Sequence, residues 1–216
     1  MKIDPAAALG AAIREVAVRE YEGKPARAVI ATRNYDTDMD DLWDALTSVE
    51  RIPRWFLPVT GELRLGGHYQ LEGNAGGTIT RCEPPRLLSL TWEFGGSMSW
   101  ITVTLREDGA GSTRLTLEHL ALVEGDHWDR FGPGAVGVGW DLALEGLKLH
   151  LASGAAVDRA AFMGWSASEE GKSFIRGSSE AWGTASIAVG TEEAAARAAA
   201  SRTTAFYTGE SPAGGG

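Results

Sequence analysis

The apolar positions of residues 139–151 recur at helical spacing. They are Trp140, Leu144, Leu147 and Leu151, with Ala143 beside them. The polar residues Asp141, Glu145 and Lys148 fall on the other side. A helix with one apolar face over about three turns must bury that face against another layer. The pattern therefore predicts a long helix that packs on a sheet, with a cavity between the two.

Alternating or β-branched runs separated by turn residues dominate the chain before this helix. The predicted strands are 28–35, 62–65, 68–71, 76–83, 86–94, 99–107 and 112–120. Two short helices, 39–46 and 48–56, separate the first strand from the others. Gly66–Gly67 and 108–111 are typical of hairpin turns. The pattern predicts an α+β fold with a curved antiparallel sheet of about seven strands wrapped on a long C-terminal helix.

The two ends of the chain differ from this middle part. Residues 1–27 are rich in alanine, and Leu9, Ile13 and Val16 predict a short N-terminal helix followed by a linker. Residues 155–209 predict a helical extension, a hairpin of helices 166–189 and 194–206. The first of these contains three glycines, each of which costs about 1 kcal/mol relative to alanine, so it must pack on the front domain or on a second copy. We expect a helix-grip domain at 28–154 and a disordered tail at 210–216.

Composition narrows the classes of partner. The formal net charge is −9, which disfavours binding to nucleic acids and to anionic membranes. Cys82 is the only cysteine, so neither an intrachain disulfide nor a thiolate cluster can form. The chain has no signal-peptide pattern at its start and no apolar run long enough to span a bilayer. We therefore expect a cytoplasmic protein without a cofactor.

Two local patterns suggest sites that their surroundings disfavour. Gly132–Gly137 matches the dinucleotide-binding fingerprint, but no buried strand precedes it and no parallel strand follows, so we interpret it as part of a flexible loop. The loop residues Glu124, Asp126, His127 and Asp129 could hold a divalent cation. Their spacing matches no metal motif, and a polar surface loop explains them equally well. We predict no metal site.

The candidate site is a set of aromatic residues around one histidine. His119 alternates with Leu115 and Leu117, which places it on the inner face of the sheet. A structural histidine bonded to the backbone is the simpler interpretation, and a ligand donor or general acid or base is the alternative. His119 is thus the one catalytic candidate. The predicted ligand-binding residues are Trp43, Trp55, Phe56, Tyr69, Trp92, His119, Trp140 and Leu144.

Several stretches together carry a resemblance to a known family. They are Leu42–Thr47, Ile52–Phe56, Leu65–Tyr69, Cys82–Leu88, Leu90–Glu93, Thr113–His119 and Gly139–Trp140. Residues 28–153 resemble the SRPBCC (START-like, helix-grip) superfamily, in the branch related to the activator of a heat-shock chaperone ATPase, and similar proteins carry a C-terminal helical extension. The resemblance implies a helix-grip fold with a deep hydrophobic cavity. It implies no universal catalytic residue.

Three functions remain as hypotheses. The first is binding of a small hydrophobic or aromatic molecule between the sheet and the long helix. The second is an enzyme of the polyketide cyclase or dehydratase type that uses His119 with a tyrosine or tryptophan donor. The third is a chaperone ATPase-activating partner that acts through its acidic surface. A homodimer formed through the C-terminal extension is a further expectation.

Overall fold

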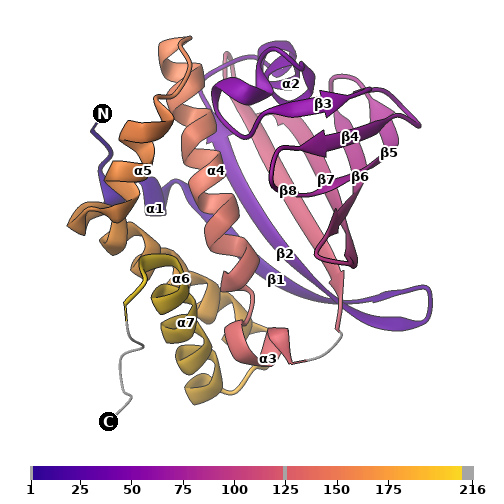
Figure 1. The fold of residues 1–216 in the computed structure, drawn as a ribbon. Helices are drawn as coiled ribbons and strands as arrows, with labels where there is room; N and C mark the ends of the chain where they lie inside the picture. Colours follow the sequence, from indigo (N-terminus) through magenta and orange to yellow (C-terminus); the bar gives the residue numbers. More distant parts are fainter. Residues whose placement is uncertain (1, 124–125, 211–216) are drawn as a thin grey trace. The chain divides into compact units, whose positions relative to one another are not determined.

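The computed structural model describes residues 2–123 and 126–210 as an eight-stranded sheet with helices before and after it (Figure 1). The strands are β1 (Ala12–Tyr21), β2 (Lys24–Tyr35), β3 (Val59–Gly61), β4 (His68–Leu71), β5 (Gly76–Glu83), β6 (Leu87–Phe94), β7 (Ser97–Glu107) and β8 (Thr113–Leu122). The helices are α1 (Pro5–Gly10), α2 (Met39–Thr47), the 3₁₀ turn η1 (Ile52–Arg54), α3 (His127–Phe131), α4 (Gly134–Ser153), α5 (Arg159–Ala167), α6 (Glu169–Ala188) and α7 (Glu193–Thr208).

The sheet confirms the predicted α+β helix-grip class. Its strand order is β1-β2-β8-β7-β6-β5-β4-β3, and each neighbouring pair from β3 to β8 is antiparallel. A meander of this kind needs only short connections, because each strand pairs with the next one along the chain. The predicted strand 62–65 is wrong: the partner of β4 is Val59–Gly61, and Gly61 lies opposite Tyr69.

The N-terminal prediction is also wrong in part. A helix does form, but it ends at Gly10, and residues 12–21 form β1. Asp4 caps α1 by accepting the amide hydrogens of Ala6 and Ala7. The expected linker is the β1–β2 turn, where Glu22 and Gly23 both have positive φ, as a tight hairpin requires. Two patterns overlap in this segment: alternation in residues 12–21 favours a strand, and the spacing of Leu9, Ile13 and Val16 favours a helix. The strand forms because it pairs with β2.

The chain divides into two compact units. Unit 1 consists of Met1–Ala31, Leu122–Leu142 and Asp158–Gly216, and unit 2 consists of Thr32–Ala121 and Ala143–Val157. The chain passes between them within β2 and within α4. The sequence predicted 28–154 as a separate domain, and that division stays a prediction. Of the tail expected to be disordered, 210–216, residues 211–216 lie outside the described residues, and Glu210 forms an ion pair with Lys172 at 2.8 Å.

Unit 2 holds the meander, α2, η1 and the second half of α4, which lies along the sheet (Figure 1). Its core alternates as predicted along the strands: Ile101, Val103 and Leu105 are buried on β7, as are Leu115 and Leu117 on β8. The Tyr35 hydroxyl donates to the carbonyl oxygen of Leu144 at 3.1 Å, which ties β2 to α4. This face of the sheet is where the long helix covers the core.

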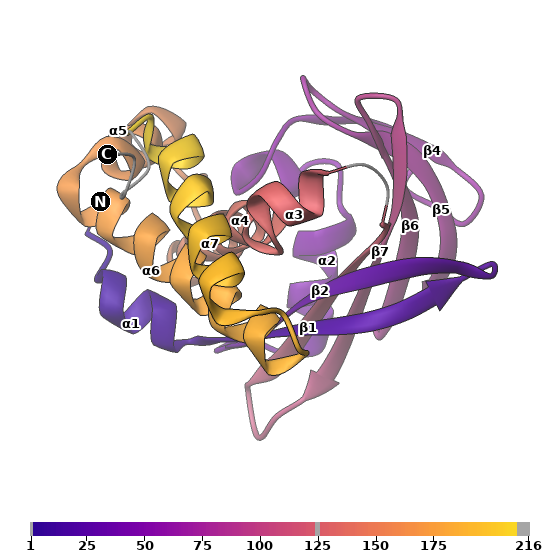
Figure 2. The same cartoon turned by 90° about the horizontal axis from the view of Figure 1, so that it is seen from below.

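Unit 1 contains the helical extension, and here α6 packs on α7, α1 and β1 (Figure 2). Ser168 caps α6 by accepting the amide hydrogen of Gly171, and Glu192 caps α7 by accepting that of Ala195. The largest buried side chains of α6, Phe174 and Trp182, are fully covered. The two predicted helices are therefore present, preceded by the additional α5.

The glycine-rich segment Gly132–Gly137 is only in part the predicted loop. α3 ends just before it at Phe131, and α4 begins within it at Gly134 rather than near Gly139. A Cβ at Gly137 would lie 2.3 Å from Cε2 of Trp182, and one at Gly134 would lie 3.1 Å from Cγ2 of Thr203. These glycines therefore let α6 and α7 approach α4 closely. Helix packing thus explains two of the glycines that match the dinucleotide-binding fingerprint, and no bound nucleotide is needed to account for them.

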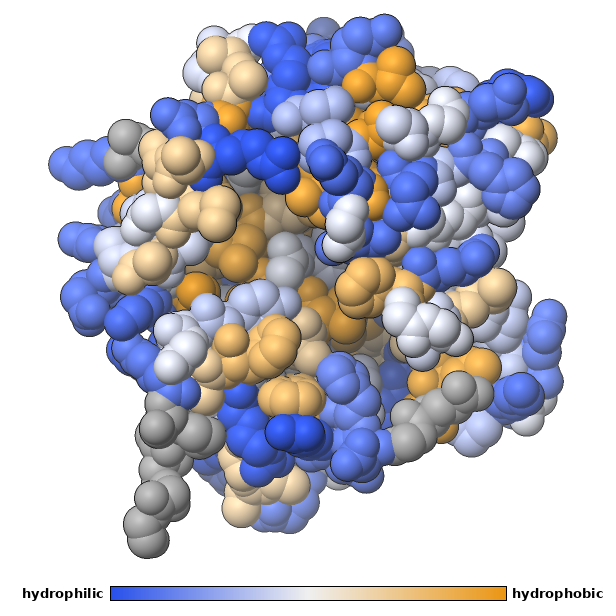
Figure 3. Space-filling model, in the orientation of Figure 1, coloured by the Kyte–Doolittle hydropathy of each residue, from blue (hydrophilic) through white to orange (hydrophobic). Residues whose placement is uncertain are grey.

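No helix among the described residues is long and apolar enough to cross a membrane. Figure 3 shows a visible face on which hydrophilic side chains predominate and apolar ones form smaller separate areas. This distribution is ordinary for a folded domain, because much of any protein surface consists of apolar atoms.

Candidate functional site

The candidate site in unit 2 is built on the sheet face that carries His119. His119 lies opposite Ile101, and Trp92 lies opposite Ser99 in the next pair of strands. Residues paired across neighbouring strands point to the same side, and so do residues two apart along a strand. The register therefore places His119, Ile101, Ser99 and Trp92 on one face. His119 is buried there, with 6% of its surface exposed.

Two hydrogen bonds fix the imidazole of His119. Its Nε2 lies 2.8 Å from Oγ of Ser99, and that hydroxyl donates to the carbonyl oxygen of Trp92 at 3.2 Å. The tautomer of the imidazole decides which of the two atoms, Nε2 or Oγ, donates the proton. Burial lowers the pKa of His119 to about 4, because the charged imidazolium loses its hydration. The side chain is therefore neutral near pH 7.

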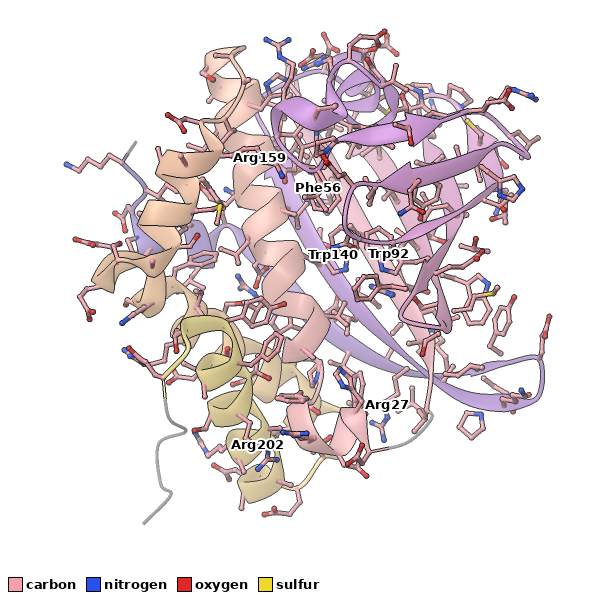
Figure 4. All side chains as sticks on the ribbon, viewed as in Figure 1. Arg27, Phe56, Trp92, Trp140, Arg159 and Arg202 are labelled. Carbon is pink, nitrogen blue, oxygen red and sulfur yellow. The ribbon has the colours of Figure 1, made fainter. Side chains whose placement is uncertain are left out.

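Trp92 provides the aromatic surface next to this histidine. The centroid of its ring lies 6.0 Å from that of the imidazole, with the planes tilted by 60°. The tryptophan is half-buried, and Figure 4 shows it on the side of the sheet toward which the meander curves. An apolar ring beside a neutral donor or acceptor is typical of the wall of a small-molecule pocket.

Tyr69 belongs to the same face, but its hydroxyl is already bonded. The buried ring comes from β4, opposite Gly77 on β5, and its hydroxyl donates to the carbonyl oxygen of Thr91 on β6 at 2.8 Å. A Cβ at Gly77 would lie 2.1 Å from the oxygen of Thr91, so only glycine lets the tyrosine and β6 approach in this way. Burial raises the pKa of Tyr69, since phenolate loses hydration and faces the charge of Glu93. Tyr69 is thus a wall residue held by the backbone.

Three further predicted residues lie in or beside α2 and η1. Trp43 is half-buried on α2. Trp55 donates from Nε1 to the carbonyl oxygen of Ala45 at 2.9 Å and stacks on Phe56, with ring centroids 5.4 Å apart. A Cβ at Gly146 would lie 2.8 Å from the oxygen of Trp55, so this glycine brings the end of η1 against α4. Both rings are half-buried, and Trp55 is oriented by its bond to α2.

The two predicted residues on α4 belong to different units. Leu144 is buried in unit 2, with 2% exposed, and Trp140 is buried in unit 1. They are four residues apart and so share one side of the helix. Seven of the eight predicted residues therefore lie in unit 2, and their role in binding stays a prediction.

Sequence reasoning missed two buried ion pairs on α4. Nη2 of Arg33 lies 2.7 Å from Oε2 of Glu145 in unit 2, with side-chain exposures of 5% and 0%. Lys148 approaches the other carboxylate oxygen at 3.4 Å. The signal was present in β2, where Arg33 alternates with the buried Ala31 and Tyr35. An arginine in an inward register requires a buried partner.

The second buried pair lies in unit 1. Nε of Arg14 donates to Oδ2 of Asp141 at 2.8 Å, and the same oxygen accepts from Oγ of Ser178 and from Nε1 of Trp182. The side of α4 opposite Trp140 and Leu144 was predicted to be its polar side, but Asp141 and Glu145 are both buried. That face was misread because its covering elements lie far away in the sequence: β1 and α6 at Asp141, and β2 at Glu145.

The described residues contain no group of three or more histidine, cysteine, aspartate or glutamate side chains that could hold a metal ion. Of the four acidic and histidine residues considered as ligands, Glu124 lies outside the described part of the chain. His127 and Asp129 fall within α3, and the His127 ring packs on Phe131.

The sequence profile described as "Activator of Hsp90 ATPase homolog 1-like protein" matches residues 36–152, more than half of the chain. The chain belongs to this family. The match spans nearly all of the predicted helix-grip domain, 28–154, and ends within α4, so it confirms the resemblance that the sequence motifs indicated. Among curated proteins, none matches the chain.

Solved structures extend the likeness beyond the family domain. The crystal structure of CalU16 from Micromonospora echinospora is 35% identical, with a TM-score of 0.64, and the match covers 81% of this chain and 98% of that one. The solution structure of CalU16 gives 33% identity, a TM-score of 0.68, and coverage of 84% and 97%. DynU16, a protein of the dynemicin biosynthetic locus, shares the fold at 20% identity and a TM-score of 0.54, over 60% of this chain and 48% of that one.

The CalU16 match also includes part of the flanking segments. The family profile spans 117 residues, since it runs from 36 to 152, whereas 81% of 216 residues is about 175. At least 58 matched residues therefore lie outside the family domain, among residues 1–35 and 153–216. The elements of unit 1 are thus partly shared with CalU16.

Proposed function

We propose that this protein binds a small hydrophobic or aromatic molecule on the sheet face of unit 2 that carries Trp92 and His119. The observation that carries the proposal is the contact between the indole of Trp92 and a buried imidazole that Ser99 holds in one orientation. A flat apolar molecule can stack on the indole, while the neutral ring system excludes charged ligands, whose burial would cost several kcal/mol. The helix-grip fold and the family support the same function.

The pKa of His119 favours binding over acid–base catalysis. A general base works best when its pKa is near the working pH, and a value of about 4 makes His119 a weak base. The hydroxyl of Tyr69, the nearest tyrosine donor on this face, is held by the carbonyl of Thr91. Both observations weigh against a cyclase or dehydratase that depends on His119 with Tyr69.

The first experiment asks whether the protein carries a ligand. Native mass spectrometry of the purified protein, followed by denaturing extraction, should release a small apolar compound. If the purified protein carries no compound, uncharged aromatic ligands from a panel should quench its tryptophan fluorescence in a saturable manner. A protein that stays empty across such a panel contradicts the proposal.

A matched pair of variants locates the site. Replacing Trp92 by leucine should weaken binding by about tenfold, because stacking on an aromatic ring and its apolar area contribute about 1–2 kcal/mol. The control is Trp100→Leu, since Trp100 lies on the opposite face of the same sheet, paired with Thr91. Equal affinities of the two variants would place the ligand elsewhere.

A further inference from the structure

Unit 1 contains a hollow of its own. Its volume is about 360 Å³, within the range of small-molecule pockets. Residues from β1, β2, α3, the first turn of α4, α6 and α7 line it, and all of them belong to unit 1. The family profile ends at residue 152, so α6 and α7 bring walls that the family domain does not supply.

One wall of the hollow carries a cation over an aromatic ring. The guanidinium carbon of Arg27 lies 5.1 Å from the ring centroid of Trp128, and both residues line the hollow. Figure 4 shows Arg27 close to α3, which carries Trp128. Stacking uses the face of the guanidinium and leaves the N–H groups at its edge available for a planar acceptor. Within residues 2–123 and 126–210, Arg27 makes no hydrogen bond or ion pair.

The other polar groups around the hollow are already bonded or exposed. Oγ of Ser179 donates to the carbonyl oxygen of Ile175, and the hydroxyls of Ser186 and Thr191 bond to each other at 2.7 Å. Asp129 also lines the hollow, but its side chain is exposed, so water and salt screen its charge. The positive charge of Arg27 is therefore the feature that a ligand would match.

Two further features shape the ligand. Gly134, the first residue of the 20-residue helix α4, lines the hollow, and the positive end of a helix favours a negative group. Small residues line one side, the buried Gly183 on α6 and Ala196 and Ala199 on α7, with the exposed Ala195 beside them, and they leave room for an apolar body. The combination suits a molecule with one anionic group and a compact apolar part.

We propose that this hollow is a second ligand site, which binds a small carboxylic acid through Arg27 and places its apolar part against α7. The site is independent of the one proposed in unit 2, because the two share no residue. A carboxylate can accept two parallel hydrogen bonds from a guanidinium.

Titration with phenylacetate tests the site directly. In amide-detected NMR of the full chain, the indole N–H of Trp128 and the amide of Gly190 should shift in a saturable manner. Phenylacetamide, which has the same shape without the charge, should bind about tenfold more weakly, since a charge-assisted hydrogen bond contributes more than a neutral one. Absence of saturable shifts at these residues overturns the proposal, as does a shift confined to Trp92.

Two variants with matched controls separate recognition from folding. Arg27→Gln should weaken phenylacetate binding by about tenfold, whereas Lys24→Gln, which removes the same charge from an exposed position of β2, should not. Ala195→Leu should fill the hollow and abolish binding, whereas Ala198→Leu on an outer face of α7 should leave it intact. Equal effects within either pair would overturn the proposal, and the alanine pair remains decisive if Arg27→Gln fails to fold.

Discussion

At the scale of single residues, the molecule buries charged and titratable groups in places where their partners come from distant segments. Arg33 meets Glu145 across 112 residues of chain, and Asp141 meets Trp182 across 41. His119 is buried without charge. Burying such a group stabilises the fold only if the group forms its ion pair or hydrogen bonds, or if it is buried in its neutral form.

His119 should make stability depend on pH. Its pKa is about 4 in the folded protein and 6.5 in the unfolded chain, so the unfolded state binds more protons between these values. The contribution is fully present above pH 6.5 and is lost as the pH falls toward 4. It amounts to about 3 kcal/mol of the free energy of unfolding.

Urea unfolding at pH 7 and pH 4 measures this dependence. His119→Gln should reduce the loss of stability between the two pH values, because glutamine does not titrate. His127→Gln, at an exposed position of α3, is the control and should leave the loss unchanged. The same pH dependence in all three proteins would show that His119 is not buried in its neutral form.

Glu145 should contribute to stability mainly by neutralising the buried charge of Arg33. Glu145→Leu leaves a buried guanidinium without its carboxylate and should lower the free energy of unfolding by about 3–5 kcal/mol. The double variant Arg33→Met/Glu145→Leu removes both charges and should recover most of that loss. Chemical denaturation of the two variants measures the difference. A double variant less stable than the single one would mean that the pair itself stabilises the fold.

At the scale of elements, β-strand alternation and turn residues predicted most of the meander. The register of β6, β7 and β8 follows from Leu88, Ile101 and Leu115, each of which begins a run of inward residues. Helical spacing was less informative, since Leu9, Ile13 and Val16 have the spacing of one helix face, yet Ile13 and Val16 lie on β1 and only Val16 is buried. The glycines of α4 could not be interpreted from the neighbouring sequence. They are needed because Trp182 on α6 and Thr203 on α7, which come later in the chain, pack directly against them.

Gly137 should be sensitive to the smallest substitution. Gly137→Ala places a Cβ 2.3 Å from the Trp182 ring, and the required displacement should cost about 1–3 kcal/mol, more than the helix gains from alanine. Gly164→Ala in α5 is the control, because nothing lies within 4 Å of its Cβ. Thermal unfolding should show a lower midpoint for the first variant and an equal or higher one for the second. Equal midpoints would contradict the packing explanation.

At the scale of the whole molecule, the sequence predicted a helix-grip domain with an added hairpin. That hairpin shares unit 1 with β1, α1 and the first half of α4, a grouping that composition could not reveal. The candidate site in unit 2 was largely predictable, because alternation alone places His119 and Trp92 inward. The hollow around Arg27 was not, since it requires six elements that local patterns cannot bring together.

Removing the extension should therefore destabilise what remains. A chain that ends at Gly154 lacks Ser178 and Trp182, and Asp141 would lose two of its three donors. We expect a lower unfolding midpoint together with a less cooperative transition, measured by circular dichroism. A truncated protein as stable as the full chain would contradict the idea that the extension stabilises the rest of unit 1.

The interleaved units also have a consequence for the order in which the protein can fold during synthesis. All of unit 2 has been translated once Val157 is added, whereas unit 1 lacks its last helix until Thr208. Its strand β1 is made well before α6, the helix on which it packs. Domains generally fold as units on the ribosome. We therefore expect the half that carries His119 to form first, and the half that carries Arg27 to close only after α7 has been made.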